Sequence, residues 1–346
     1  MRQTLFRIWI EQPWSLWTNL PNQPPYLGAC WVAIFLGLLI FGYHWLIKDK
    51  EFLGDTMNWL FWGCAIIGLS LAPFLKILPN WVPVYGYGAM MLIGFTTAMW
   101  FSSVRAKAAG HNPEIIFDAA LWVLLIGILG GRIAYLIQYG KHVFKDANHL
   151  QEAAFAAINL TEGGLVQIGG LLGGTLGFLL FCKVKNVDFF EFADIMAPAI
   201  FIGIGFGRIG CLLNGCCYGD RCDLPWGIQF PAGSVTFAEL AARGFVDPNS
   251  TATFSLHPTQ IYSSINGFVL AFVTSIYFWY RKYRGDVFAL ACILYAFTRV
   301  QIEFLRADEM GQLGTMFTIS QLYSGGIILC GIFIMFYVRK KHQPLV

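Results

Sequence analysis

Four charged side chains stand inside long apolar stretches of the sequence: Arg132, Arg208, Arg299 and Glu303. An ionised group within a membrane span is costly, so such a residue usually belongs to a site. The planar guanidinium of arginine binds phosphate through two parallel hydrogen bonds. The sequence therefore predicts a cavity for an anionic group, such as a lipid phosphate. For Arg299 and Glu303, the simpler alternative is an ion pair that only neutralises two buried charges.

Further polar residues are predicted at the same depth in the membrane. Tyr295 lies four residues before Arg299, and Arg306 lies three residues after Glu303. A helix would carry these side chains on one face. Other polar or glycine residues stand at the ends of neighbouring apolar stretches: Tyr87, Gly169, Gly170, Asn214 and His257. We expect the set to converge on one site, although His257 alone could be a capping or hydrogen-bonded histidine.

Two glycine-rich segments precede two of the arginines. Gly127-x-x-x-Gly131 comes directly before Arg132, and Gly203-x-x-x-Gly207 comes directly before Arg208. Small residues four apart allow helix backbones to approach closely. The pattern could therefore bring two arginines near one another, and ordinary glycine-rich helix packing is the alternative.

Four cysteines form the main competing signal: Cys211, Cys216, Cys217 and Cys222. They could bind zinc or form a disulfide, but the paired C-x-x-C spacing of many zinc sites is missing. We therefore expect no metal ligand and no cofactor. The sequence also has no Walker motif and no dinucleotide fingerprint, so energy from ATP is not expected.

The composition indicates a membrane protein. Hydrophobic residues make up 57% of the chain and charged residues 12%, and the mean hydropathy is +0.59. Soluble domains carry about 25% charged residues. The net charge is only +3, and the basic residues separate apolar stretches without forming a stripe. Nucleic acid is therefore not an expected partner.

The apolar stretches predict about nine membrane spans, at residues 28–47, 57–77, 85–104, 115–138, 164–183, 193–213, 258–280, 287–305 and 317–338. Lysine and arginine are concentrated in alternate loops, which the positive-inside rule places in the cytoplasm. The loops 139–163 and 214–257 then face outward. The four charged residues consequently lie towards the outer leaflet. Asp118 and Asp194, near the inward starts of two spans, are expected to be partners of helix N-termini.

Several motifs, taken together and in this order, resemble the bacterial prolipoprotein diacylglyceryl transferases. The resemblance runs from about Tyr87 to the C-terminus. The matching segments are Gly130-Gly131-Arg132-Ile133, Gly169-Gly170-Leu171, Asp194 with Ala197-Pro198, Gly207-Arg208-Ile209-Gly210, Asn214-Gly215, Tyr218-Gly219, His257-Pro258-Thr259-Gln260-Ile261-Tyr262 and Tyr295-x-x-x-Arg299-x-x-x-Glu303-x-x-Arg306. Any one of these motifs alone would be weak.

The resemblance implies an all-α integral membrane fold with a seven-span core at residues 81–346. Residues 1–80 would be an N-terminal extension with two further spans. The implied activity is transfer of the diacylglyceryl group of phosphatidylglycerol to the lipobox cysteine of a preprolipoprotein, which forms a thioether and releases glycerol 1-phosphate. The implied partners are these two substrates and membrane lipids. The implied location is the bacterial cytoplasmic (inner) membrane, with the active site towards its outer leaflet.

The resemblance also assigns roles to the residues found above. Arg208, Arg299 and Glu303 are expected to be catalytic. The expected substrate-binding residues are Tyr87, Arg132, Gly169, Gly170, Asn214, Gly219, His257, Tyr295 and Arg306.

Three positions differ from the most familiar family pattern. Ile168 stands where many members have a histidine proposed as a base, Cys211 replaces an asparagine and Cys216 replaces an acidic residue.

Two other functions remain as alternatives. One is a solute or ion transporter, because intramembrane charges also line transport paths. The other is an inactive lipid-binding relative that uses its cysteines for redox or metal chemistry.

Overall fold

The computed structural model describes residues 4–9, 12, 14–16, 24–46, 64, 66–67, 69–70, 81–145, 149–159, 164–306 and 318–341. The chain forms two compact units. Unit 1 comprises Met1–Ile93, Phe206–Tyr262 and Leu305–Asp308, and unit 2 comprises Gly94–Gly205, Ser263–Phe304 and Glu309–Val346. Most of the described residues are helical, which confirms the predicted helical class.

Unit 1 begins with a three-stranded sheet that was not predicted. Strand β1 (Thr4–Trp9) lies between β2 (Tyr26–Gly28) and β3 (Trp81–Tyr85), parallel to the first and antiparallel to the second. The residues of β1, TLFRIW, are mostly aromatic or β-branched types that favour strands. Helix α1 (Ala29–Leu46) follows β2 directly, and α4 (Gly86–Ala108) follows β3 directly.

The long loop between α8 (Phe189–Asn214) and α10 (Thr259–Tyr280) is ordered and belongs to unit 1. It contains the short helix α9 (Val235–Ala242) and a small core of Tyr218, Phe230, Leu240 and Leu256. Backbone bridges tie its segments together, including Ile228 to Leu256. The loop therefore has its own packing and can hold residues in fixed positions.

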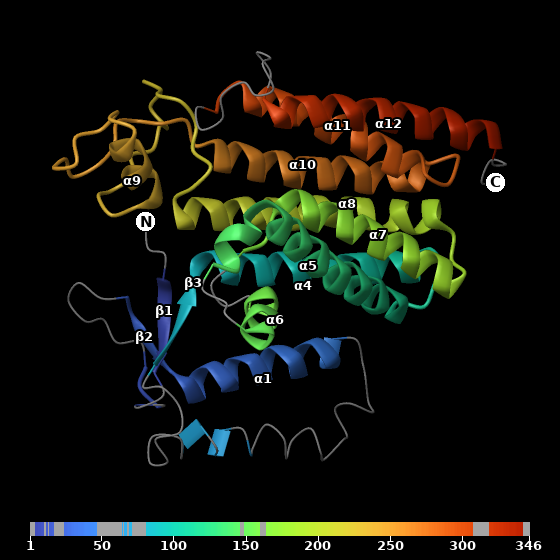
Figure 1. The fold of residues 1–346 in the computed structure, drawn as a ribbon. Coiled ribbons are helices and arrows are strands. Elements are labelled where there is room, and N and C mark those ends of the chain that lie inside the picture. The colour runs from blue at the N-terminus through green and yellow to red at the C-terminus, as the bar shows by residue number, and fades with distance from the viewer. Residues whose placement is uncertain are drawn as a thin grey trace. The chain divides into compact units, whose positions relative to one another are not determined.

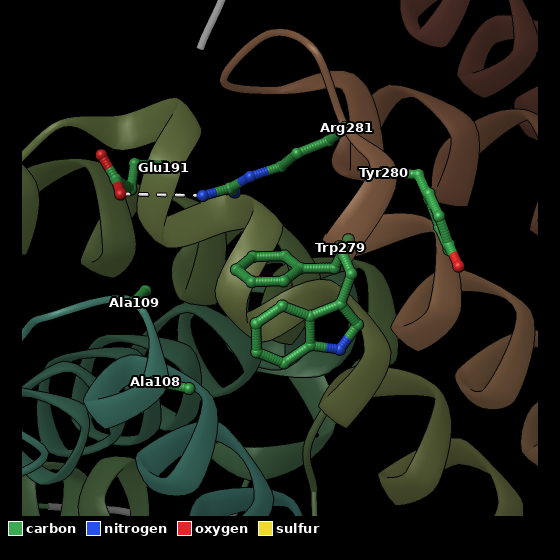
Figure 2. A pocket seen from close by; sticks show the side chains of 7 residues that line it. Ala108, Ala109, Glu191, Trp279, Tyr280 and Arg281 are labelled. Carbon is green, nitrogen blue, oxygen red and sulfur yellow. Dashed lines mark ion pairs between the residues drawn. The ribbon is translucent and has the colours of Figure 1, made fainter. Parts of the chain in front are cut away.

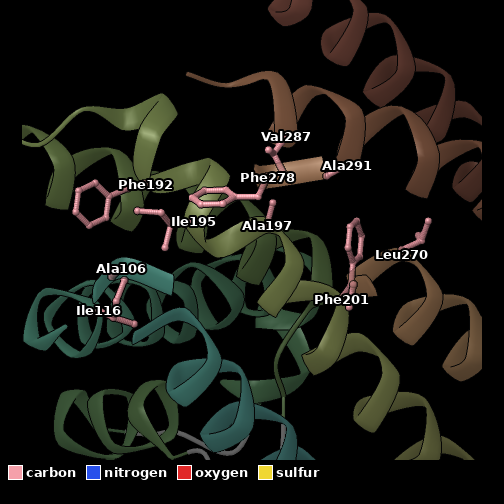
Figure 3. Packing of buried hydrophobic residues seen from close by; sticks show 11 residues of the cluster. Ala106, Ile116, Phe192, Ile195, Ala197, Phe201, Leu270, Phe278, Val287 and Ala291 are labelled. Atoms are coloured by element: carbon pink, nitrogen blue, oxygen red, sulfur yellow. The ribbon is translucent and has the colours of Figure 1, made fainter. Parts of the chain in front are cut away.

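Unit 2 is a bundle that contains α5 (Glu114–Val143), α6 (Leu150–Ile158), α7 (Gln167–Lys185), α11 (Asp286–Glu303) and α12 (Ile319–Lys341), with the larger parts of α4, α8 and α10. Figure 1 shows α8, α10, α11 and α12 running side by side. Figure 3 shows the main hydrophobic core of this unit, where Phe192, Ile195, Phe201 and Phe278 pack together with smaller residues of α4, α5, α10 and α11.

Helices α5 and α7 pack against each other through glycines. A Cβ on Gly130 would lie 2.5 Å from the Gly169 carbonyl oxygen, and a Cβ on Gly169 would lie 2.4 Å from the Gly130 carbonyl oxygen. By contrast, a Cβ on Gly203 would meet nothing within 4 Å. Close helix approach also occurs at the second segment, but at Gly205 and not at Gly203. A Cβ on Gly267 of α10 would lie 2.9 Å from the Phe201 carbonyl oxygen and 3.0 Å from the Gly205 amide nitrogen.

Five described helices are long and apolar enough to cross a membrane, namely Glu114–Lys141, Ile168–Lys185, Phe189–Asn214, Thr259–Tyr280 and Ser320–Lys341. The chain is thus a helical multi-pass membrane protein. The predicted number of nine spans is not confirmed. The predicted span at 57–77 lies mostly outside the described residues. Helix α11 does coincide with a predicted span, but it carries Asp286, Arg299 and Glu303 and is not among the five.

Charged side chains join the ends of α8, α10 and α11 within unit 2. Asp194 accepts hydrogen bonds from the backbone amides of Gly285 and Phe288, both at 2.8 Å, and pairs with Arg281 at 2.9 Å. It therefore acts as a partner of a helix N-terminus, as predicted, although the helix is α11 and not its own helix α8. Asp118 instead pairs with Lys185 at 2.5 Å.

A cavity of about 410 Å³ opens beside this network (Figure 2). It is formed by Ala108, Ala109, Glu191, Phe278, Trp279, Tyr280 and Arg281. The Arg281 side chain pairs with Glu191 across it at 3.7 Å. None of the predicted site residues borders this cavity, so its charges are explained by the ion-pair network that joins the helices.

Candidate active site

The predicted site residues fall into two sets, each within one unit. Unit 1 contains Tyr87, Arg208, Asn214, Gly219, His257 and Arg306. Unit 2 contains Arg132, Gly169, Gly170, Tyr295, Arg299 and Glu303.

In unit 1, Arg208 and Arg306 interact electrostatically with the same thiol, that of Cys217. Arg208 lies in the last two turns of α8, and Arg306 lies three residues after the end of α11. Both interact electrostatically with the Cys217 thiol. Tyr87, in the first turn of α4, interacts with Arg208 and with the neighbouring thiols. The structure therefore brings Tyr87, Arg208 and Arg306 together around the end of α8.

Gly219 connects His257 and Arg306 through the backbone. Its amide donates to the His257 carbonyl at 3.0 Å, and it forms an antiparallel bridge with Arg306. A Cβ on Gly219 would lie 2.6 Å from the His257 Cβ and 2.7 Å from the Leu305 carbonyl oxygen. Only glycine fits between these two segments, so Gly219 fixes the position of Arg306 relative to His257. The His257 ring lies beside Tyr262, with Nδ1 3.4 Å from the hydroxyl.

Three of the four clustered cysteines form a compact group at the end of α8. The Sγ atoms of Cys211, Cys216 and Cys217 all lie within 4.8 Å of one another. Cys222 is buried elsewhere, against Gly227. All nine cysteines of the chain are free thiols in this structure. The other two thiols donate to Cys217, and Arg208 and Arg306 lie near it, so the pKa of the Cys217 thiol is lowered.

The backbone that carries these thiols is fixed by three side chains from the following loop and helix. The carbonyl of Gly215 accepts from the Thr236 hydroxyl at 2.7 Å, that of Cys216 from the Gln260 amide at 2.8 Å, and that of Cys217 from the Thr259 hydroxyl at 2.8 Å. These three donor residues are at most 1% exposed. We call this arrangement the carbonyl clamp. Because each of the three consecutive carbonyls is held, the clamp orders the whole turn after α8.

In unit 2 the predicted ion pair is present. Arg299 Nη1 pairs with Glu303 Oε2 one turn away on α11, and both residues are buried. Arg299 Nη2 also donates to Ser320 at 3.2 Å, and Thr318 donates to Glu303 at 3.1 Å. The guanidinium is therefore held in a fixed orientation by its own helix and by the start of α12. Its Nε donor has no hydrogen-bond partner among the described residues.

Arg132 donates to backbone carbonyls. Its three nitrogens donate to Ala156 at 2.7 Å, to Ala157 at 2.8 Å and to Gly164 at 3.0 Å. Ala156 and Ala157 lie in the last turn of α6, whose free carbonyls attract a cation. This geometry favours a positioning role for Arg132, because it holds α6 and the start of the following segment.

The remaining predicted residues in unit 2 have packing contacts. Gly169 allows the close approach of α5 and α7 described above, whereas a Cβ on Gly170 would meet only the Gly127 carbonyl oxygen, at 3.8 Å. The Tyr295 ring packs against Phe201, with ring centroids 6.0 Å apart. Substrate binding by Gly169, Gly170 and Tyr295 stays a prediction.

Sequence reasoning did not identify the residues that hold the site in place. Thr236, Thr259 and Gln260 form the carbonyl clamp, and Ser320 supports Arg299. Thr259 and Gln260 belong to the quoted motif after His257, so that motif was a usable signal. Thr236 and Ser320 are ordinary polar residues, and only the folded contacts distinguish them.

The fold and the site define a class: a multi-pass helical membrane protein that keeps arginines at the ends of its spans. Comparison with known sequences then identifies the family. A sequence model of the prolipoprotein diacylglyceryl transferase family matches residues 73–337. The chain belongs to this family.

Curated relatives cover most of the chain. A protein from Clostridium tetani is 36% identical over 260 residues, which is 75% of this chain and 95% of that protein. A protein from Clostridium perfringens is 35% identical over 258 residues, which is 74% of this chain and 91% of that protein. A protein from Proteus mirabilis is 32% identical over 280 residues, which is 76% of this chain and 91% of that protein. All three are named as phosphatidylglycerol–prolipoprotein diacylglyceryl transferases.

Proposed function

We propose that this protein transfers the diacylglyceryl group of phosphatidylglycerol to the lipobox cysteine thiol of preprolipoproteins. The products are a thioether-linked lipid on the acceptor and glycerol 1-phosphate. The observation that carries this proposal is the match to relatives with that name, which covers 75% and 74% of this chain and 95% and 91% of the two Clostridium proteins. The alternatives of a transporter or an inactive lipid-binding relative have no comparable support.

The arrangement of charges supports this chemistry. The reaction moves negative charge onto a phosphate leaving group, and preorganised donors stabilise such charge best in a site with little water. Arg208 and Arg299 are the proposed catalytic guanidinium groups, and Glu303 orients Arg299 through their ion pair. Lipid phosphate is a suitable ligand for both arginines, because their planar forks make two-point hydrogen bonds.

The proposed substrate contacts are residues in the same units as Arg208 and Arg299. Tyr87, Asn214, Gly219, His257 and Arg306 belong to unit 1, where Arg208 lies. Arg132, Gly169, Gly170 and Tyr295 belong to unit 2, where Arg299 lies. Within this proposal Arg132 acts mainly by holding α6, because its donors are used on backbone carbonyls.

A reconstituted transfer assay tests the proposal. The purified protein is placed in phosphatidylglycerol vesicles with a peptide that contains a lipobox cysteine, and the peptide is analysed by mass spectrometry. We expect a mass increase equal to one diacylglyceryl group and release of glycerol 1-phosphate. A peptide with serine in place of the cysteine, and vesicles of phosphatidylethanolamine alone, are the controls. An unmodified cysteine peptide with correctly inserted protein would contradict the function.

We also propose where the reaction occurs. The alternation of lysine and arginine between loops supports an inner-membrane protein whose active site faces the outer leaflet. Residues 1–80 form a proposed extension with two spans before the catalytic core at 81–346. The family match begins at residue 73, close to this boundary.

A further inference from the structure

The group of three thiols at the end of α8 has the dimensions of a metal site. Zinc binds thiolates at about 2.3 Å, so sulfurs in a tetrahedral site are about 3.8 Å apart. The Sγ atoms of Cys211, Cys216 and Cys217 lie within 4.8 Å of one another. They would need to approach by about 1 Å at most to bind one ion. Linear spacing did not indicate this site, because the chain turns sharply after Asn214.

The turn is built to bring the thiols together. Helix α8 ends at Asn214, and Gly215 and Cys217 both have a positive φ, of 73° and 60°. A positive φ at a non-glycine residue such as Cys217 is sterically unfavourable. The carbonyl clamp compensates this strain by holding the backbone from Gly215 to Cys217. Strain that the surroundings maintain in this way is typical of functional sites.

The surroundings of the sulfurs suit bound thiolates. The Asn214 side-chain amide donates to the Cys216 sulfur at 3.6 Å, and such contacts orient and tune metal ligands. Three thiolates and a divalent cation leave one net negative charge. Arg208 and Arg306 both act on Cys217, so a positive environment for that charge is already present.

The donor set selects the kind of metal. Three thiolates bind soft or borderline cations such as zinc, whereas magnesium and calcium require oxygen ligands. Zinc sites with four protein ligands are structural, but sites with three keep a position open for water or substrate. Cys222, the remaining cysteine of the sequence cluster, is outside the group. Among the residues that the structure describes, the three-thiol group is therefore of the open type.

We propose that Cys211, Cys216 and Cys217 bind a thiophilic divalent cation of the zinc type, whose fourth coordination position takes the cysteine thiol of the acceptor protein. The inference rests on the proposed function, because that thiol is the nucleophile of the transfer reaction. A metal-bound thiol is deprotonated outright. The site thus provides the thiolate without requiring a histidine or carboxylate base.

The step is balanced without an oxidant or reductant. Binding of the acceptor thiol to the cation releases its proton to water. The sulfur then forms a bond to the glyceryl methylene carbon of phosphatidylglycerol, while the bond between that carbon and the phosphate oxygen breaks. Glycerol 1-phosphate leaves with the electron pair of the broken bond. The neutral thioether is a weaker ligand than a thiolate, so the lipidated acceptor dissociates.

Cobalt titration of the reduced, metal-free protein tests the site, because Co²⁺ replaces Zn²⁺ and reports thiolate ligands by absorption. We expect about one Co²⁺ per chain with thiolate-to-metal charge-transfer bands, all displaced by Zn²⁺. Replacing any one of Cys211, Cys216 or Cys217 by serine should remove these bands. Cys222→Ser is the matched control and should retain them. Asn214→Ala should weaken Zn²⁺ binding by about 10- to 100-fold.

The proposed binding of the acceptor cysteine at the fourth coordination position is tested in the same samples. A lipobox peptide with cysteine should change the Co²⁺ ligand-field spectrum, and the serine peptide should not. Each cluster variant should transfer about 30-fold more slowly, because a free thiol with a pKa of about 8.5 is only about 3% ionised at neutral pH.

Three results would overturn the inference. They are absence of thiolate–Co²⁺ bands in the wild-type protein, a disulfide among the three cysteines in anaerobically prepared protein, and normal transfer by the triple serine variant. Failure of the proposed function gives a different pattern: the bands and the response to the cysteine peptide are present, but the peptide is never lipidated.

Discussion

At the scale of single residues, the two arginines proposed to be catalytic differ from lysine in shape more than in charge. Lysine retains the positive charge but loses the planar fork that binds phosphate at two points. We expect Arg208→Lys and Arg299→Lys each to lower the transfer rate by about 100- to 1,000-fold, the usual effect of losing one preorganised donor. The reconstituted transfer assay with phosphatidylglycerol vesicles and a lipobox peptide measures this effect, with membrane insertion of each variant verified by its level in the membrane fraction.

Glu303→Gln provides the comparison for Arg299. The carboxylate orients the guanidinium and accepts from Thr318, so its loss should lower the rate less than Arg299→Lys does. If an arginine-to-lysine variant transfers at a near-normal rate, that arginine is only structural. Arg299 and Glu303 would then form the simple charge-neutralising pair.

At the scale of helices, the packing of α5 against α7 can be tested with two glycines. Gly130→Ala would place a methyl group 2.5 Å from the Gly169 carbonyl oxygen, and overpacking of this kind costs about 1–3 kcal/mol. Gly203→Ala is the control in α8, where the added methyl meets nothing within 4 Å. The control should be neutral or up to about 1 kcal/mol more stable, because alanine is the better helix former. Thermal unfolding in detergent measures both effects. Equal stability of the two variants would contradict the close approach of the helices.

A second comparison concerns the ion pairs of two aspartates. The Asp194 side chain is fully buried and joins α8 to Arg281 and to the start of α11. Asp194→Asn should therefore lower the free energy of unfolding by about 3–5 kcal/mol, as expected for breaking a buried pair. Asp118→Asn removes the pair with Lys185, whose side chains are 49% and 42% exposed, and should cost at most about 1 kcal/mol. A larger loss at Asp118 would contradict this account.

At the scale of the whole molecule, the predicted topology can be checked directly. Reporter fusions should place the C-terminus and the 281–284 loop in the cytoplasm, and the 214–257 loop outside. The reason is the concentration of lysine and arginine in alternate loops. An outward-facing 281–284 loop would reverse the membrane side proposed for the active site.

Sequence alone predicted the helical membrane class, the family and the Arg299–Glu303 pair, because hydropathy, ordered motifs and helical spacing are local signals. It did not predict the sheet of β1, β2 and β3, which depends on pairing between distant segments. It treated four cysteines as one possible metal or disulfide cluster, but it did not show that only Cys211, Cys216 and Cys217 form a compact group. That grouping depends on a backbone turn and on the clamp from Thr236, Thr259 and Gln260, which no local pattern encodes.

The contacts of Arg132 have a consequence for how the protein is made. The carbonyls that accept from its side chain belong to residues that follow it by 24, 25 and 32 positions. At about 5–20 residues per second, the ribosome adds the first of these roughly 1–5 s after Arg132 itself. During this interval water or lipid head groups must solvate the guanidinium, since an unpaired arginine within a single inserted helix is costly, by up to about 2.5–3.5 kcal/mol at the helix centre. The nascent α5 should therefore reach its final position in the bilayer only after the chain has been synthesised as far as Gly164.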